Sequence, residues 1–294
     1  MNELNIPGKI PKPIRKWNCY KFECFGDYID AYAETLGNTE CCYLELYAGC
    51  GSCICKGTDC QIDDPSLRAL KTKTKFVKYI FVVRDRQNAE NLTWLTTSYN
   101  ADNIEIIIGN CINEKVIHQL FDLIPRSASS FALIDPPGYR GMRWSTIKKL
   151  AAHGSDWKGH KIELLIIFPL EMALLRNLVR PECEASITRL YGNHQWEEIK
   201  GQRLNGRIEL GEVRNRLIEL FKVGLRGLGY RYVEDFKPAS HSRQPFYHLV
   251  WASDHDHQAK ILKDTWGKPR YLPCELLYGT KEPVKNSLLT TKIN

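Results

Sequence analysis

Two short apolar runs, each followed by a loop rich in glycine or proline, constrain this chain more than any other feature. The first run, Tyr43 to Leu46, leads into a loop that contains Gly49 and Gly51. The second run, Phe131 to Ile134, leads into Asp135-Pro136-Pro137-Gly138. In α/β proteins the carboxyl ends of parallel strands meet at one edge of the sheet, and ligands bind there. We therefore expect the two loops to face each other as a cofactor pocket and a substrate pocket.

The rest of the chain alternates apolar runs with helical patterns. Strands are expected at 42–47, 79–83, 104–108, 131–134 and 163–168, and helices at 64–73, 89–98, 115–123, 145–152 and 170–179. Two late runs, 230–236 and 246–252, have the alternating polarity of strands that pair antiparallel. The pattern predicts an α/β fold with a doubly wound, mostly parallel sheet of about seven strands and Rossmann-like topology.

Breaks in this rhythm suggest the domain organisation. Residues 1–40 are expected to form an N-terminal arm and a helix that starts near Phe25. Residues 41–262 form the predicted Rossmann domain, and 181–212 read as a helical insertion or lid because they contain no clean strand. Residues 263–294 contain Pro269, Pro273 and Pro283 and are expected to form a C-terminal tail.

Composition places the chain among globular proteins. It has 294 residues, of which 43% are hydrophobic and 26% charged, and its formal net charge of +7 permits a polyanionic partner without requiring one. No segment reaches the roughly 18 apolar residues that span a bilayer, and the N-terminus has no apolar signal region. We therefore expect a cytoplasmic protein with no membrane partner, in which the eleven cysteines are reduced thiols or metal ligands.

The order of strand, glycine loop, strand, acid, strand and Gly-Asn resembles a class I methyltransferase, which implies S-adenosylmethionine as cofactor. Glu45, expected within the turn, could bind the amino acid end, and Gly49 and Gly51 let the backbone approach closely. Asp85 could accept hydrogen bonds from the ribose hydroxyls, and Asn110 could read the adenine edge. A generic doubly wound fold with another ligand, or none, is the alternative. Dinucleotide and phosphate-loop fingerprints fit less well, because the required further glycine and the Gly-Lys-Ser/Thr sequence are missing.

The second loop resembles the Asp/Asn-Pro-Pro-aromatic tetrad of enzymes that methylate an exocyclic amine of a base. In such enzymes the acidic side chain and a proline carbonyl hold the amine, so that catalysis is mainly positioning. Asp135, Pro136 and Pro137 match the tetrad, but Gly138 stands at the aromatic position and Tyr139 comes one residue later. A tight turn with no substrate is the alternative interpretation.

Basic and aromatic residues near this loop are candidates for binding a nucleic acid. Arg140, Arg143 and Trp144 follow the proline motif, and His241 and Arg243 lie between the last two predicted strands. Such side chains suit backbone contacts and base stacking. An exposed basic helix face and ordinary loop residues explain them equally well.

Four cysteines fall inside the first loop and its continuation. The spacing of Cys50 and Cys53 matches half of a zinc or iron–sulfur site, which Cys55 and Cys60 could complete. A short loop cannot easily wrap one ion and also cradle a cofactor. We therefore favour reduced, small side chains in a tight loop and predict no metal.

Three segments together resemble the three-Cys-motif partner proteins. They are Tyr43 to Gly49, Leu133 to Gly138 and Phe246 to Ser253, and the resemblance extends from the first helix to residue 262. It implies a methyltransferase-type Rossmann fold and a second protein that carries a cysteine motif. The chain departs from the family where cysteines stand in the glycine loop.

Three functions remain open from the sequence. The leading hypothesis is an S-adenosylmethionine-dependent methyltransferase that acts on an exocyclic amine of a base in DNA or RNA. The second is a catalytically inactive, methyltransferase-like partner or scaffold subunit, for example in a defence or modification system. The third is a metal-binding redox or nuclease-like accessory protein.

Overall fold

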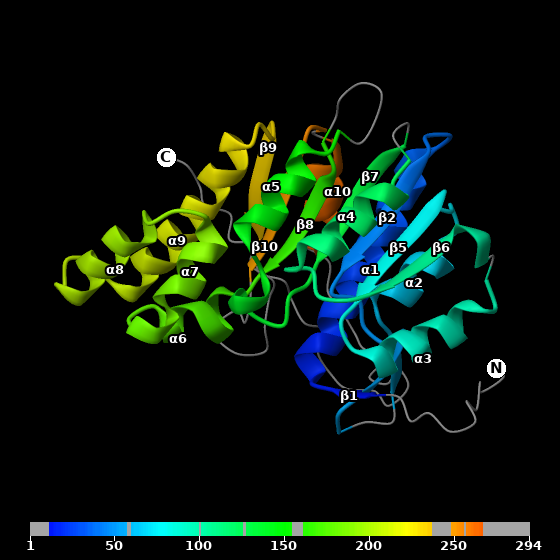
Figure 1. Ribbon diagram of the computed structural model, residues 1–294, viewed down its shortest axis with the longest axis horizontal. Coiled ribbons are helices and arrows are strands. Elements are labelled where there is room, and N and C mark those ends of the chain that lie inside the picture. Colours follow the sequence, from blue (N-terminus) through cyan, green and yellow to red (C-terminus); the bar gives the residue numbers. More distant parts are fainter. Residues whose placement is uncertain are drawn as a thin grey trace.

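Seven strands form the central sheet in the part of the chain that the structure describes (Figure 1). This computed structural model describes residues 12–57, 60–99, 101–125, 128–154, 161–236, 248–255 and 257–266. The strand order is β6-β5-β2-β7-β8-β10-β9. The strands are β2 (Cys41–Leu46), β5 (Lys78–Val83), β6 (Ile104–Ile108), β7 (Ser129–Ile134), β8 (Glu163–Phe168), β9 (Tyr232–Phe236) and β10 (His248–Ser253).

The sheet is mostly parallel, as predicted. β2 pairs in parallel with both β5 and β7, and the parallel pairing continues outward to β6 and β8. β10 is antiparallel to its neighbours β8 and β9, which confirms the expected late antiparallel pair. The chain moves outward from β2 to β6 and then returns to β7 on the other side of β2. The carboxyl ends of β2 and β7 therefore form the switch point where doubly wound sheets bind ligands.

Helices cover both faces of the sheet, which confirms the doubly wound fold. The crossover helices are α2 (Pro65–Lys71), α3 (Arg86–Thr96), α4 (Glu114–Leu123) and α5 (Trp144–Ala152), with short 3-10 turns at Ala101–Asn103, Tyr139–Gly141 and Pro181–Cys183. One core cluster packs α4, α5 and the later helices on one face. A second packs α2 and α3 on the other face, together with α1 (Lys16–Leu36) and α10 (His257–Trp266). Within the described residues, no helix combines the length and apolarity needed to cross a membrane.

Helix α1 (Lys16–Leu36) begins well before the predicted start near Phe25, so that prediction is wrong. Its apolar stripe continues backward through the buried residues Tyr20 and Cys19. The buried stripe therefore gives the early turns a packing surface, and packing rather than propensity stabilises most helices. Helix α10 (His257–Trp266) packs against α1 on the same face of the sheet.

The cysteine-rich segment after β2 is more ordered than the predicted loop. β3 (Ser52–Cys55) and β4 (Gln61–Asp63) pair antiparallel, and β1 (Lys12–Ile14) pairs in parallel with β3. The loop prediction failed because the cysteines of β3 do not give the usual apolar pattern of a strand, and its antiparallel partner β4 is equally short.

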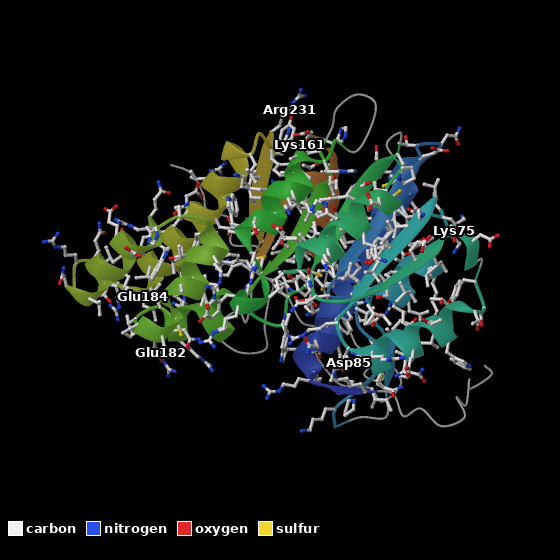
Figure 2. All side chains as sticks on the ribbon, in the orientation of Figure 1. Lys75, Asp85, Lys161, Glu182, Glu184 and Arg231 are labelled. Carbon is white, nitrogen blue, oxygen red and sulfur yellow. The ribbon has the colours of Figure 1, made fainter. Side chains whose placement is uncertain are left out.

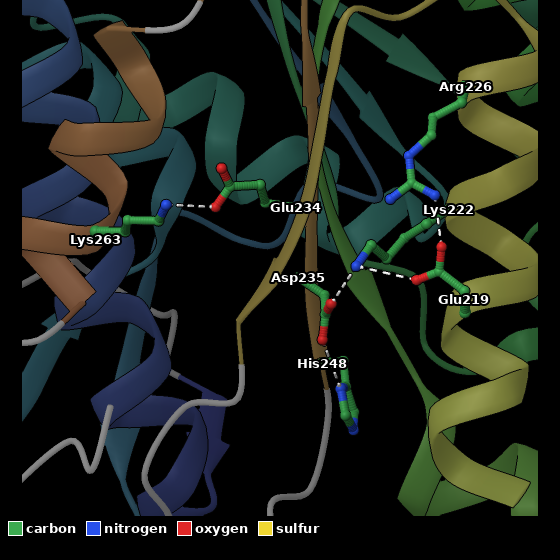
Figure 3. Close-up of polar contacts among 7 residues, drawn as sticks. All are labelled: Glu219, Lys222, Arg226, Glu234, Asp235, His248 and Lys263. Carbon is green, nitrogen blue, oxygen red and sulfur yellow. Dashed lines mark hydrogen bonds and ion pairs between the residues drawn. The ribbon is translucent and has the colours of Figure 1, made fainter. Parts of the chain in front are cut away.

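The insertion after β8 is helical and projects from one side of the sheet (Figure 1). A π-helical turn (Leu170–Leu174) leads into α6 (Leu175–Asn177), followed by α7 (Glu184–Tyr191), α8 (Trp196–Leu204) and α9 (Leu210–Gly227). Figure 3 shows how α9 and α10 join β9 from opposite sides. Lys222 Nζ lies 2.7 Å from Asp235 Oδ1, and Lys263 Nζ lies 2.8 Å from Glu234 Oε2.

Candidate active site

The loop after β2 is shaped around the carboxylate of Asp64. The Gly51 backbone N–H donates to Asp64 Oδ2 at 2.7 Å, and Gly51 has a φ of +87°. A Cβ at Gly49 would lie 2.4 Å from the same oxygen, so a larger residue there would displace the carboxylate. Tyr47 also has a positive φ of 77°, a conformation that L-residues rarely adopt. Its hydroxyl donates to the Gly141 carbonyl at 2.5 Å and so links this loop to the turn after the proline motif.

Glu45 lies inside β2 and not in the turn where it was predicted. It continues the strand register, opposite Phe81 of β5 and Leu133 of β7. It is buried, and the Tyr43 hydroxyl donates to its Oε2 at 3.2 Å. Burial, together with the charges of Asp64 and Asp135, raises the pKa of Glu45 well above its usual range.

Asp64 is a second buried acid at this edge. Burial raises its pKa to about 6, against the lowering effect of the Gly51 and Leu67 backbone N–H groups. Burial therefore favours the neutral, protonated form of both acids, which is what their raised pKa values express.

Asp85 and Asn110 follow the next two strands at the same edge. Asp85 is the exposed N-cap of α3, and its Oδ1 accepts from the Asn88 backbone N–H at 2.9 Å. Asn110 follows β6, and its Oδ1 accepts from the Ile112 N–H at 3.2 Å. Figure 2 shows Asp85 at this edge, while Lys161 and Arg231, which precede β8 and β9, lie at the opposite edge. The strand order thus brings the predicted cofactor residues to one side of the sheet.

Asp135 follows β7, next to the end of β2. Its backbone N–H donates to the Leu46 carbonyl at 3.4 Å, and its Oδ2 lies 2.5 Å from Lys21 Nζ. Lys21 is only 5% exposed, and its Nζ lies 5.3 Å from the ring centroids of both Trp17 and Phe22. The amino-terminal half of α1 therefore places the buried cation of Lys21, flanked by the Trp17 and Phe22 rings, next to the proline motif.

These residues line a cavity of about 430 Å³. Its apolar walls include Trp17, Phe22, Pro136, Pro137, Ile167 and Pro169, with Gly138 and Ala173. Asn18, Lys21 and Asp135 supply the polar side chains. The cavity lies beyond the carboxyl ends of β7 and β8, since Asp135 follows β7 and Pro169 follows β8. An apolar cavity with a few convergent polar groups, at the carboxyl ends of parallel strands, is a typical small-ligand site.

The residues after the proline motif face other surroundings. Tyr139 is 2% exposed and packs in the core cluster over α4 and α5, where its hydroxyl accepts from Arg140 Nε at 3.3 Å. A second guanidinium nitrogen of Arg140 lies 3.1 Å from Cys183 Sγ, in the helical insertion. Arg143 donates to the Ile112 carbonyl at 3.4 Å. These contacts place the three side chains within the protein's own packing and hydrogen bonding.

Trp144 fills a gap between helices. A Cβ at Gly192 would lie 2.2 Å from its ring, and one at Gly224 would lie 2.7 Å away. The indole also meets Phe221 edge-on, with ring centroids 5.5 Å apart. The ring is therefore committed to packing α5 against α7 and α9. The other predicted substrate residues, His241 and Arg243, lie outside the described residues.

The four loop cysteines divide into two groups. Cys50 and Cys53 lie with their sulfur atoms 3.9 Å apart, and the hydrogen bond from Cys53 lowers the pKa of the Cys50 thiol. Cys55 and Cys60 pack in a separate small cluster with Cys19. Across the described ranges, no set of three or more His, Cys, Asp or Glu side chains is arranged to hold a metal ion.

Sequence reasoning missed Lys21, Trp17, Phe22 and Asp64. Lys21 precedes Tyr28 by about two helical turns, so the two lie on the same side of α1. A lysine on the sheet-facing stripe of a helix could have been recognised once the helix was extended backward. Asp64 was signalled only as a residue before the helix-opening Pro65.

No protein-family model matches this chain, and no curated protein sequence matches it. Solved structures with partial likeness include an rRNA methylase from Streptococcus thermophilus, at 11% identity and a TM-score of 0.41, over 78% of this chain and 94% of that one. Protein LPL1258 from Legionella pneumophila has 10% identity and a TM-score of 0.47, over 83% and 91%. TYW2 from M. jannaschii, in complex with AdoMet, has 12% identity and a TM-score of 0.36, over 78% and 75%.

Proposed function

We propose that this protein is an S-adenosylmethionine-dependent methyltransferase that acts on an exocyclic amine of a nucleic-acid base. The observation that carries the proposal is the position of Asp135-Pro136-Pro137 on a cavity of about 430 Å³, beside the end of β2. In this proposal residues 41–262 form the catalytic domain, and 181–212 an insertion within it.

In this proposal the residues at the carboxyl ends of β2, β5 and β6 would hold the cofactor. When bound, S-adenosylmethionine would supply an electrophilic methyl group on a cationic sulfonium. Asp64, which fills the space beside Gly49 and accepts from the Gly51 N–H, would hold this loop in shape against the cofactor, with the buried Glu45 in the strand before it. Asp85 would accept from ribose hydroxyls, and Asn110 would face the adenine.

The residues around the cavity would position the target amine. The Asp135 carboxylate and the Pro136 carbonyl would accept its two hydrogens and leave the nitrogen lone pair directed at the methyl group. Gly138 leaves the usual aromatic position empty, but Trp17 and Phe22 of α1 supply aromatic rings to the same cavity. The ion pair of Lys21 and Asp135 is neutral overall, and the cavity around it is mostly apolar. Such surroundings suit a base that has been extruded from its helix.

A second candidate is an inactive partner subunit of a protein that carries a cysteine motif. The resemblance to three-Cys-motif partner proteins suggests it, and one observation favours it. Lys21 already holds the Asp135 carboxylate at 2.5 Å, so a substrate amine must share or take that oxygen.

Transfer of labelled methyl groups to total RNA and to DNA tests the proposal. Asp135→Ala is expected to reduce incorporation at least ~100-fold, since a group that orients the reacting atoms is lost. Asp122→Ala, an exposed carboxylate on α4, is the matched control and should retain activity. Calorimetry with the cofactor separates the alternatives: heat without transfer indicates an inactive cofactor-binding subunit, and no heat indicates a scaffold.

A further inference from the structure

Lys21 is held in an unusual place for a lysine. Its 5% exposure is rare for a charged side chain, and such burial requires a partner. Asp135 is that partner, and its side chain remains 19% exposed toward the cavity. The ion pair therefore forms part of the cavity wall and does not lie beneath it.

Helix α1 fixes Lys21 in this position. Tyr28, about two turns later on the same side, donates its hydroxyl to Glu163 Oε1 at 2.9 Å. The Trp17 and Phe22 rings flank the ammonium group at 5.3 Å on the amino-terminal turns. Lys21 is thus a constrained donor and not a mobile surface cation.

The two charged groups present complementary hydrogen-bonding roles to a ligand. A carboxylate only accepts hydrogen bonds, and a lysine ammonium only donates them. A group that satisfies both at once carries an N–H donor directly beside an unprotonated acceptor. The apolar walls, which include Trp17, Phe22 and Pro137, suit a flat aromatic ring.

We propose that Lys21 donates to the ring nitrogen beside the target amine, while Asp135 accepts from the amine itself. This inference rests on the proposed function and specifies its substrate class. On the Watson–Crick edge, adenine and cytosine present an amine next to an unprotonated ring nitrogen. Guanine presents an amine next to a ring N–H, which would set a donor against the ammonium of Lys21. The site accordingly selects adenine or cytosine over guanine presented through its Watson–Crick edge.

The test measures binding of fluorescent single-stranded oligonucleotides without cofactor. Each oligothymidine carries one central adenine, cytosine or guanine, or the analogue 1-deazaadenine or 3-deazacytosine, in which the ring nitrogen is replaced by C–H. Wild-type protein should bind adenine or cytosine about tenfold tighter than its deaza analogue, as expected for loss of one charge-assisted hydrogen bond. The adenine and cytosine arms identify which base is used.

Variants assign the preference to Lys21. Lys21→Met should bind the parent and deaza strands equally, and Lys16→Met, an exposed lysine of the same helix, should keep the preference. Because Lys21→Met leaves Asp135 without its cation, Lys21→Met/Asp135→Asn provides a neutral pair, and it should also lose the preference. Circular dichroism confirms that each variant is folded.

Three results would overturn the inference: equal wild-type binding of parent and deaza strands, tighter binding of guanine, or binding of none of the strands. Methyl incorporation into the same strands is measured separately. Transfer without discrimination by Lys21 leaves the methyltransferase proposal standing, whereas discrimination without transfer supports the base pocket and contradicts the catalytic proposal.

Discussion

Helix α1 meets a carboxylate near each end of the sheet, and the two contacts differ in kind. Near its amino end, Lys21 forms an ion pair with Asp135, which follows β7 and borders the cavity. Two turns later, Tyr28 donates to Glu163, the first residue of β8. Trp251 Nε1 and Ser253 Oγ also donate to Glu163, at 3.0 and 2.9 Å.

The comparison separates a structural acid from a candidate functional one. Three neutral donors converge on Glu163. Glu163 is not among the described residues that line the cavity. Asp135 has one cationic partner, and its side chain is partly exposed, so it keeps acceptor capacity for a ligand. The same helix therefore stabilises the core at one end and lines the cavity at the other.

The largest effect is expected from removal of the structural acid. Glu163→Ala leaves three buried donors without an acceptor, at about 1 to 3 kcal/mol for each unsatisfied group. We expect the free energy of unfolding to fall by about 3 to 5 kcal/mol, measured by urea denaturation. Glu163→Gln, which keeps an acceptor in place, should lose much less. A loss below about 1 kcal/mol for the alanine variant would remove the distinction drawn between the two acids.

The pH dependence of stability tests the same residue. Burial raises the pKa of Glu163 to about 7, from an ordinary value of 4.5. The folded state therefore binds this proton more tightly than the unfolded state. The resulting stability is fully present below about pH 4.5 and is lost as the pH rises through about 7.

At about 1.4 kcal/mol per pH unit, the difference amounts to about 3 kcal/mol. We expect wild-type stability relative to Glu163→Gln to fall by this amount between pH 4.5 and 8. Asp64, whose pKa is also raised, is present in both proteins and cancels in the comparison. A constant difference across this range would show that the Glu163 pKa is not raised.

The inner strands could be predicted because their burial is almost continuous. A parallel strand buried on both faces reads as an unbroken apolar run, and β8 coincides with the predicted strand at 163–168. The meeting of the loops after β2 and β7 at one edge then follows from strand order alone. These features depend on patterns local to each segment.

The contribution of α1 to the cavity and the packing of the loop after β2 could not be predicted, because both depend on contacts between distant segments. Nothing near Lys21 in the sequence indicates that Asp135 will neutralise it, and nothing near Gly49 indicates that Asp64 lies against it. Tyr139 was expected in the site because it stands next to the motif. The turn at Tyr139–Gly141 carries it into the core instead.

An intermediate effect is expected at Gly49, in the loop at the carboxyl end of β2. Gly49→Ala places a methyl group 2.4 Å from Asp64 Oδ2, so the carboxylate or the loop must shift. We expect a loss of about 1 to 3 kcal/mol in stability and about tenfold weaker cofactor binding by calorimetry. Gly211→Ala, in α9 with open space around its added methyl, is the control and should be neutral or slightly stabilising. Equal effects of the two substitutions would contradict the proposed fit of the loop around Asp64.

The smallest effect is expected from substitutions of Asp85. They distinguish two roles of this side chain, capping helix α3 and binding the cofactor. Asp85 caps α3 through its Oδ1, and loss of an N-cap costs about 1 kcal/mol. Asp85→Ala should therefore lower both stability and cofactor affinity. Asp85→Asn keeps the cap, since asparagine caps as well as aspartate, but it loses the carboxylate that would accept from two hydroxyls. Unchanged stability with weaker cofactor binding in the asparagine variant is the expected result, measured by urea denaturation and calorimetry. If the asparagine variant binds cofactor as tightly as the wild type, Asp85 only caps the helix and does not bind cofactor. The proposed cofactor-binding residues would then be limited to those after β2 and β6.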